Sequence, residues 1–244
     1  MSKENNYIFS DTVIIKTIGL EKDEIMNKTS DIFSNKDNIE VLCYEKGVEC
    51  ILKIKSKTKD EDDSSKVLND VIKKLQDRLG EDIYALRDVE IEEVVAKMLI
   101  DKKLTISTAE SCTGGLVAGT LINYPGISEV FLEGVVTYTN ESKHKRLGVK
   151  NDTLNKYGAV SEETAKEMAI GVAKMAGTDT SIVTTGIAGP GGGTEEKPVG
   201  LVYIGVYVKG NVKVERHVFK GDRQEVRRAA VVTGIDMLRR ILSE

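Results

Sequence analysis

The sequence predicts an α/β protein, a three-layer α/β/α sandwich preceded by a small α+β domain. Two observations support this fold class. Beyond residue 88, amphipathic helices alternate with short apolar strands, which is the pattern of a sheet covered by helices on both faces. The composition also changes near residue 85: three glycines and no proline precede it, whereas the other 19 of the 22 glycines and all three prolines follow. We therefore place the domains at 1–87 and 88–244.

The first domain is predicted to have the element order β-α-β-β-α. A hairpin is indicated by two apolar, alternating runs on either side of Gly47. Cys43 and Cys50 lie on this hairpin, and we interpret them as small apolar core residues. The predicted elements are a strand at 13–18, a helix around 25–33, hairpin strands at 39–44 and 48–55, and a helix at 67–79.

The second domain is predicted to carry its functional groups at strand-to-helix turns, because ligands of open α/β sheets bind at the carboxyl ends of strands. Two helix starts are marked by Ser161, which two acids follow, and by the capping box that begins at Asp222. The predicted order is a helix at 90–103, a strand at 104–109, a helix at 114–122, a strand at 134–138 with a turn at 139–142, a helix to 176, a strand at 180–185, a ribbon at 200–208 and 212–219, and a final helix.

The composition limits the possible classes of function. A net charge of −4 and 5% aromatic residues argue against a nucleic-acid-binding protein. Three cysteines without C-x-x-C spacing and only two histidines argue against a disulfide framework or a zinc site. No apolar run is long enough to span a membrane, and residues 1–6 lack the apolar core of a signal peptide. We expect a cytoplasmic protein.

The run T-A-E-S-C-T-G-G at residues 108–115 places a carboxylate, hydroxyls and a thiol between a predicted strand and a predicted helix. Backbone N–H groups at such a turn can hold an oxyanion or a phosphate. Ser111 is either the cap of the following helix or a nucleophile. Cys112 is the rival nucleophile, because a helix N-terminus can activate a thiol. The spacing leaves these alternatives open and assigns no role to Glu110.

A serine nucleophile needs a base, and the sequence offers few candidates. Neither His144 nor His217 is followed by an acid that indicates a Ser-His-Asp triad. Lys143 follows the strand at 134–138, and it can act as a base if its surroundings lower its pKa from about 10.4 toward about 7 to 8. Tyr138 can orient this lysine or relay a proton. The alternatives are a solvated surface charge for Lys143 and a packed aromatic for Tyr138.

A glycine-rich loop at 186–193 follows a predicted strand. It has neither the G-x-G-x-x-G spacing of a dinucleotide site nor the G-K-[ST] of a P-loop. Its glycines favour close contact with a ligand such as a nucleotide, with a purely conformational loop as the alternative. At another helix start, Arg223, Arg227 and Arg228 can clamp a phosphate or form a solvated helix face. The candidate ligand contacts in these regions are Thr185, Gly186, Gly189, Gly191 and Arg223.

Five motifs in the second domain occur in an order that is specific to one family. They are T-A-E-S-C-T-G-G, V-T-Y-T-N-E-S-K, G-A-V-S-E-E, T-G-I-A-G-P-G-G-G-T-E-E-K-P-V-G and G-D-R-x-x-V-R-R. Over about residues 90–244, the chain resembles the C-terminal domain of the CinA family, whose stand-alone members are nicotinamide-nucleotide amidases. Nothing matches the molybdopterin-binding-like domain that begins the family's long proteins, so we expect either a natural short form or a shortened one.

Residues 1–85 resemble the KH-like middle domain of the long CinA proteins. This likeness predicts no RNA binding, because the segment lacks a G-x-x-G loop and is acidic, with 14 Lys/Arg against 18 Asp/Glu.

The resemblance implies hydrolysis of nicotinamide mononucleotide, a carboxamide, to nicotinic acid mononucleotide and ammonia, without a metal or cofactor. Matched motif by motif, Ser111 is the nucleophile, Lys143 its base and Tyr138 the assisting tyrosine. A homodimer is expected. The alternatives are a non-catalytic nucleotide-binding or interaction module and a hydrolase of another small amide. The expected oxyanion-binding groups are the backbone N–H groups of Cys112, Thr113 and Gly114.

Overall fold

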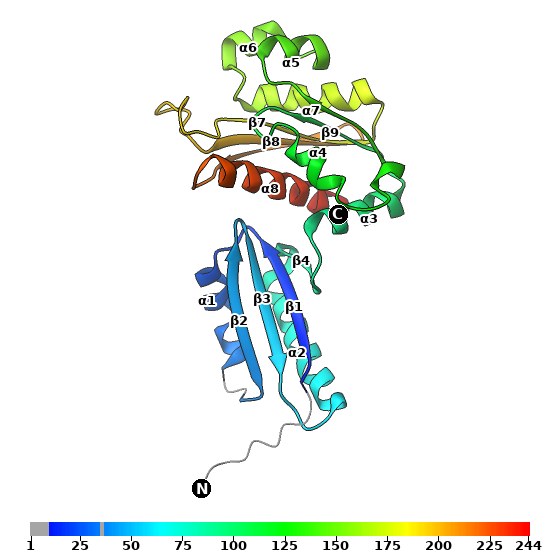
Figure 1. Ribbon diagram of the computed structural model, residues 1–244, viewed down its shortest axis with the longest axis vertical. Coiled ribbons are helices and arrows are strands. Elements are labelled where there is room, and N and C mark those ends of the chain that lie inside the picture. The colour runs from blue at the N-terminus through cyan, green and yellow to red at the C-terminus, as the bar shows by residue number, and fades with distance from the viewer. Residues whose placement is uncertain (1–9, 35–36) are drawn as a thin grey trace. The chain divides into compact units, whose positions relative to one another are not determined.

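The computed structural model describes residues 10–34 and 37–244, and the chain divides into two compact units, an N-terminal unit at 1–89 and a C-terminal unit at 90–244 (Figure 1). Residues 1–6, which we interpreted as lacking a signal peptide, lie outside the described residues. Within the described part, no helix is both long and apolar enough to cross a membrane.

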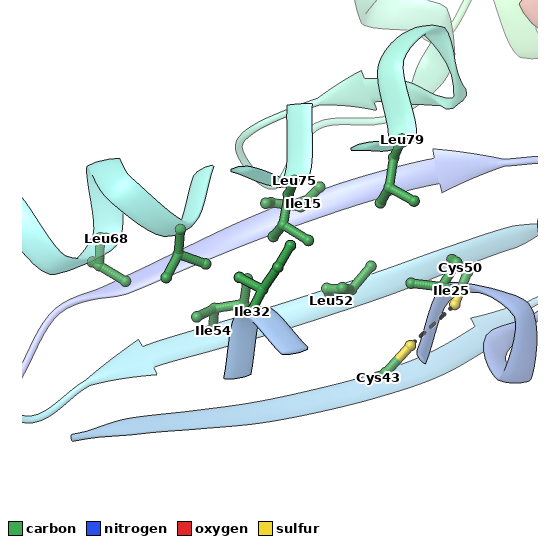
Figure 2. Packing of buried hydrophobic residues seen from close by; sticks show 11 residues of the cluster. Ile15, Ile25, Ile32, Cys43, Cys50, Leu52, Ile54, Leu68, Leu75 and Leu79 are labelled. Carbon is green, nitrogen blue, oxygen red and sulfur yellow. Dashed lines mark hydrogen bonds between the residues drawn. The ribbon is translucent and has the colours of Figure 1, made fainter. Parts of the chain in front are cut away.

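The N-terminal unit is a four-stranded antiparallel sheet of order β2-β3-β1-β4 with two helices packed on one face. Alternation along β3 turns Cys50, Leu52 and Ile54 into the core, where α2 contributes Leu75 (Figure 2). The elements are β1 (Thr12–Ile18), α1 (Lys22–Phe33), β2 (Ile39–Lys46), β3 (Glu49–Ser56), α2 (Glu61–Leu79), the 3₁₀ turn η1 (Gly80–Asp82) and β4 (Ile83–Ala85). The predicted order missed β4, because three residues are too few to show alternation.

Cys43 and Cys50 lie in this core with their sulfur atoms 3.3 Å apart, and both are free thiols (Figure 2). Burial raises the pKa of the Cys50 thiol to about 12, so the thiolate is scarce at neutral pH. Their position supports the interpretation that they are small apolar core residues.

The C-terminal unit is the predicted three-layer sandwich, with a sheet of order β6-β5-β7-β8-β9 between two helical layers. Helix α7 lies on one face of the sheet, and α8 lies on the other beside α3 (Figure 1). The elements are α3 (Ile91–Lys102), β5 (Ile106–Glu110), α4 (Leu116–Leu121), η2 (Ile127–Glu129), β6 (Phe131–Val136), α5 (Asn140–Leu147), α6 (Asn151–Tyr157), α7 (Glu162–Ala176), β7 (Thr180–Gly186), β8 (Leu201–Val208), β9 (Asn211–Val218) and α8 (Arg223–Ser243).

Both predicted helix starts are confirmed. The side chain of Ser161 accepts a hydrogen bond from the N–H of Thr164 at the start of α7. Asp222 and Glu225 form the reciprocal capping box at the start of α8.

The predicted turn at 139–142 is wrong, because helix α5 begins there. The side chain of Thr139 accepts a hydrogen bond from the N–H of Ser142 and caps this helix. The sequence N-E-S-K-H-K-R-L has a single apolar residue, Leu147, and therefore no apolar stripe from which a helix could be predicted. The other residue that the helix buries is Lys143. The neighbouring helix α6 was missed as well.

The strand predicted at 134–138 starts and ends earlier than expected, since β6 spans Phe131–Val136 and Tyr138 lies beyond it. Strands β5, β6 and β7 are parallel, and Glu110 at the end of β5 pairs with Val136 of β6 and Thr184 of β7. The segments that follow these three strands therefore meet at one edge of the sheet, which is the edge where sites of α/β folds lie.

Candidate active site

Ser111 follows β5 directly and is held at the sheet edge. Its main-chain N–H donates to the carbonyl oxygen of Thr184, 3.0 Å away. Helix α4 begins only at Leu116, with Gly115 at the capping position and no side chain in that role. The interpretation of Ser111 as a helix cap is therefore wrong, and its hydroxyl is free for other contacts.

Glu110, to which the sequence assigned no role, organises the turn. Its side chain is buried and accepts hydrogen bonds from the main-chain N–H groups of Gly115 at 2.9 Å, Val117 at 3.0 Å and Ala118 at 2.9 Å. The hydroxyl of Thr113 donates to the same carboxylate at 2.6 Å. One carboxylate thus satisfies the amide groups at the start of α4 that the helix leaves without partners.

The predicted oxyanion-binding groups lie between Ser111 and this helix start. Among the described residues, no main-chain oxygen accepts from the N–H groups of Cys112, Thr113 and Gly114, and the N–H of Cys112 lies against its own thiol. Because Glu110 binds the amides that follow, these three stay the predicted oxyanion-binding groups.

Lys143 extends from α5 to Ser111 in the turn that follows β5. Its side chain is 1% exposed, and its Nζ donates to Ser111 Oγ at 3.1 Å, to the carbonyl oxygen of Thr137 at 2.8 Å and to that of Tyr138 at 3.3 Å. Burial lowers the pKa of Lys143 to about 8. The interpretation of Lys143 as a solvated surface charge is therefore wrong.

The three contacts fit both protonation states of the lysine. The ammonium has three N–H donors for the three oxygens. A neutral amine keeps two donors for the carbonyl oxygens of Thr137 and Tyr138, and the hydroxyl of Ser111 then donates to the lone pair of Nζ. Because burial lowers the pKa of Lys143 to about 8, part of the amine is neutral near pH 7, and this neutral form can take a proton from Ser111.

Cys112, the rival nucleophile, is buried, and burial raises the pKa of its thiol to about 11. The thiol therefore stays protonated at neutral pH, and a protonated thiol is a poor nucleophile. Lys143 donates to Ser111 and not to Cys112. The geometry therefore favours Ser111.

Tyr138 is placed by its main chain and not by its phenol ring. Its carbonyl oxygen accepts from Lys143, while the side chain is 63% exposed and the phenol has no hydrogen-bond partner in the described part of the chain. The ring is not packed against the strand edge, which was one interpretation of the sequence. Its predicted part in orienting or relaying stays a prediction.

The glycine-rich loop after β7 is built partly by its own packing. A Cβ on Gly186 would lie 2.5 Å from the carbonyl oxygen of Leu201, and one on Gly189 would lie 2.6 Å from Val199 Cγ1. Around Gly191 the same position is open. Close packing therefore explains Gly186 and Gly189, while Gly191 remains a candidate ligand contact.

Two further predicted ligand contacts already have partners within the protein. The hydroxyl of Thr185 donates to the carbonyl oxygen of Ala159 at 2.7 Å. Arg223 Nη1 donates to the carbonyl oxygen of Gly189 at 2.8 Å. In this structure both side chains hold backbone segments in place, so any contact they make with a ligand adds to that role.

Arg227 lies in the predicted arginine cluster, but the sequence did not place it at the turn. Its Nη2 donates to the carbonyl oxygen of Thr113 at 2.7 Å and would lie 3.5 Å from a Cβ on Gly114. It follows Arg223 by four positions, so both point from one face of α8 toward the loop and the turn. The four-residue spacing from Arg223 was the sequence signal that could have predicted the position of Arg227 near the turn.

The described residues contain no group of three or more His, Cys, Asp or Glu side chains that could hold a metal ion. A family model described as the CinA C-terminal domain matches residues 88–242, and one described as the damage-inducible protein CinA KH domain matches residues 12–85. The chain belongs to the CinA family. The family assignment suggested by the five motifs is confirmed.

Among curated CinA relatives, a competence-damage inducible protein of Clostridium beijerinckii is 58% identical over 229 residues, and one of Clostridium perfringens strain 13 is 53% identical over 240 residues. The alignments cover 94% and 97% of this chain but 56% and 58% of those proteins. The chain therefore spans little more than half the length of the curated relatives it matches.

Solved structures of the CinA superfamily resemble this chain as well. A competence/damage-inducible protein from Agrobacterium tumefaciens is 43% identical with a TM-score of 0.60, covering 66% of this chain and 99% of that chain. A CinA superfamily protein from Klebsiella pneumoniae is 35% identical with a TM-score of 0.61, covering 63% and 96%. The mixed α/β fold is thus shared with solved members of the family.

Proposed function

We propose that this chain is a nicotinamide-nucleotide amidase that converts nicotinamide mononucleotide to nicotinic acid mononucleotide and ammonia. The observation that carries the proposal is the 3.1 Å contact between Lys143 Nζ and Ser111 Oγ, in which the lysine is buried and its pKa is lowered to about 8. A hydroxyl paired with such an amine is an activated nucleophile for acyl transfer. CinA-family membership is consistent with an amidase, and the resemblance of the motifs supplies the substrate.

In the first half-reaction, neutral Lys143 takes the hydroxyl proton while Ser111 Oγ bonds to the carboxamide carbon of the substrate. The negative charge that develops on the carboxamide oxygen is bound by the N–H groups of residues 112–114. The Lys143 ammonium then gives its proton to the amide nitrogen as the C–N bond breaks. Ammonia leaves, and Ser111 carries the acyl group as an ester.

In the second half-reaction, Lys143 is neutral again and takes a proton from water. The hydroxide oxygen bonds to the ester carbon, the same N–H groups bind the oxyanion, and the proton returns to Ser111 as the ester bond breaks. The carboxylic acid product gives its remaining proton to ammonia or solvent and leaves as a carboxylate. Tyr138, whose carbonyl oxygen accepts from Lys143, is proposed to orient the lysine or to relay a proton.

Ammonia release from nicotinamide mononucleotide tests the proposal directly. We expect release by the wild type, loss in Ser111→Ala, and unchanged release in Ser128→Ala, which alters an exposed serine in η2. If the wild type binds the nucleotide without turnover, the chain is a binding module and the proposal fails. Equal turnover of nicotinamide, its riboside and its mononucleotide contradicts the substrate assignment.

We also propose that the protein acts in the cytoplasm and forms a homodimer, as expected from the sequence. Light scattering coupled to gel filtration measures the mass directly, and a single species near the chain mass of 26.8 kDa contradicts the dimer.

A further inference from the structure

Lys197 connects the glycine-rich loop to the segment that precedes α7. Its Nζ donates to the carbonyl oxygens of Tyr157 at 2.7 Å and Val160 at 2.8 Å. Gly158 lies between these two acceptors, and a Cβ there would lie 3.2 Å from Nζ. A glycine at that position therefore leaves room for the ammonium group.

The segment that accepts Lys197 is itself firmly bound. The carbonyl oxygen of Gly158 accepts from the hydroxyls of Ser161 at 3.0 Å and Thr164 at 2.8 Å, both at the start of α7. The carbonyl oxygen of Ala159 accepts from Thr185 at the end of β7. Every carbonyl group of residues 157–160 thus accepts a hydrogen bond from a side chain. Lys197 is anchored to a segment that α7 and β7 hold in place.

The glycine-rich loop continues into an exposed segment before the chain returns to the sheet. Residues 191–196 are exposed, and the loop returns to the sheet only at Gly200, whose N–H donates to the carbonyl oxygen of Ile187. Arg223 binds the loop at Gly189, and Lys197 binds the segment that follows it, where Thr194 and Lys197 are joined by two hydrogen bonds. A glycine-rich segment loses much conformational freedom when it becomes ordered, so a fixed end lowers the cost of ordering it on a ligand.

This loop begins beside the nucleophile. Thr184, two residues before Gly186, accepts the Ser111 N–H through its carbonyl oxygen, and its hydroxyl lies 2.6 Å from the hydroxyl of Thr113. A displacement of the loop is therefore expected to move the residues beside Ser111 and Thr113.

We propose that Lys197 is a positioning residue of the amidase site, which holds the glycine-rich loop in place to receive the nucleotide. This inference rests on the proposed function. Lys197 itself touches the two main-chain carbonyls, and it acts on the substrate through the loop. Its loss is therefore expected to weaken nucleotide binding more than it slows the acyl transfer at Ser111.

The test compares Lys197→Met, which keeps the side-chain length without the donors, with Lys197→Arg, which can still donate to both carbonyls. Lys166→Met is the control, because Lys166 is an exposed residue of α7. We expect Lys197→Met to raise KM for nicotinamide mononucleotide about tenfold with kcat within about twofold of the wild type. Lys197→Arg and the control are expected to stay near the wild-type KM.

A second readout needs no catalysis. Hydrogen–deuterium exchange of the ligand-free protein is expected to be about tenfold faster at residues 190–199 in Lys197→Met and near wild type in Lys197→Arg and Lys166→Met. Unchanged exchange together with unchanged KM in Lys197→Met overturns the inference. If the wild type is inactive, the proposed amidase function is contradicted. Faster exchange of residues 190–199 in Lys197→Met would then still support Lys197 as the residue that holds the loop in place.

Discussion

Lys143 Nζ lies 3.1 Å from Ser111 Oγ, although 32 positions separate the two residues in the chain. Ser111 follows β5, and Lys143 lies in α5, which follows the neighbouring parallel strand β6. The lysine has exchanged water for two main-chain carbonyls and one hydroxyl. Because it is buried, this amine has a lower pKa, about 8, than a lysine exposed on the surface.

Replacing Lys143 by methionine is expected to lower kcat by about 10²- to 10⁴-fold, because a general base contributes about that much to a proton-transfer step. Methionine has a similar volume and removes a charge from a buried position, so the variant should stay folded, which its thermal melting checks. Lys145→Met, which alters an exposed lysine of the same helix, is the control. A Lys143→Met enzyme with more than about a tenth of wild-type kcat contradicts the role of base.

The activity is expected to rise with pH through about 8, the pKa of Lys143, and to level off above it. Burial lowers this pKa, so the neutral, proton-accepting form is more abundant at pH 7 than in an exposed lysine. Below that pKa, kcat/KM should fall about tenfold per pH unit as the amine becomes protonated. The pH profile of kcat/KM measures this directly, and a rate that decreases as pH rises through 8 shows that the protonated lysine is needed instead.

Cys112→Ala is expected to keep kcat within about threefold of the wild type, whereas Ser111→Ala should lose about 10³-fold or more. Burial raises the pKa of the Cys112 thiol to about 11, so alkylation by iodoacetamide at pH 7.5 should also be slow in the folded protein, on the order of hours. The reverse pattern, with Cys112→Ala inactive and Ser111→Ala active, moves the nucleophile to the thiol.

Glu110→Gln should disturb the turn without changing its size. An amide has one oxygen where the carboxylate has two, so an NH₂ group comes to face a main-chain N–H donor of α4. We expect the free energy of unfolding to fall by about 1–3 kcal/mol, as when a buried hydrogen-bonding group loses its partner, and kcat to fall with it. Chemical denaturation and ammonia release measure the two effects. Glu129→Gln, at an exposed position in η2, is the control, and equal values for both variants remove Glu110 from this role.

Many helices and strands of the C-terminal unit could be predicted, because short sequence patterns determine where they begin and end. Ser161 and Asp222 mark helix starts through contacts with residues three positions away, and the apolar run of β7 is visible in the sequence alone. Helix α5 could not be predicted in this way. Its polar sequence lacks an apolar stripe. It buries Lys143, a residue type that is usually exposed, so the sequence pattern does not show that this side chain faces the interior.

The site shows the same division. The sequence alone places hydroxyls, a thiol and a carboxylate at the turn 108–115, and its motifs identify the family. Tertiary structure decides which partners and which pKa each of these side chains has. Pairing of β5 with β6 brings Lys143 to Ser111, burial lowers one pKa and raises that of Cys112, and Glu110 binds the amides of α4. These properties depend on the groups that surround each side chain, and residues distant in sequence supply those groups.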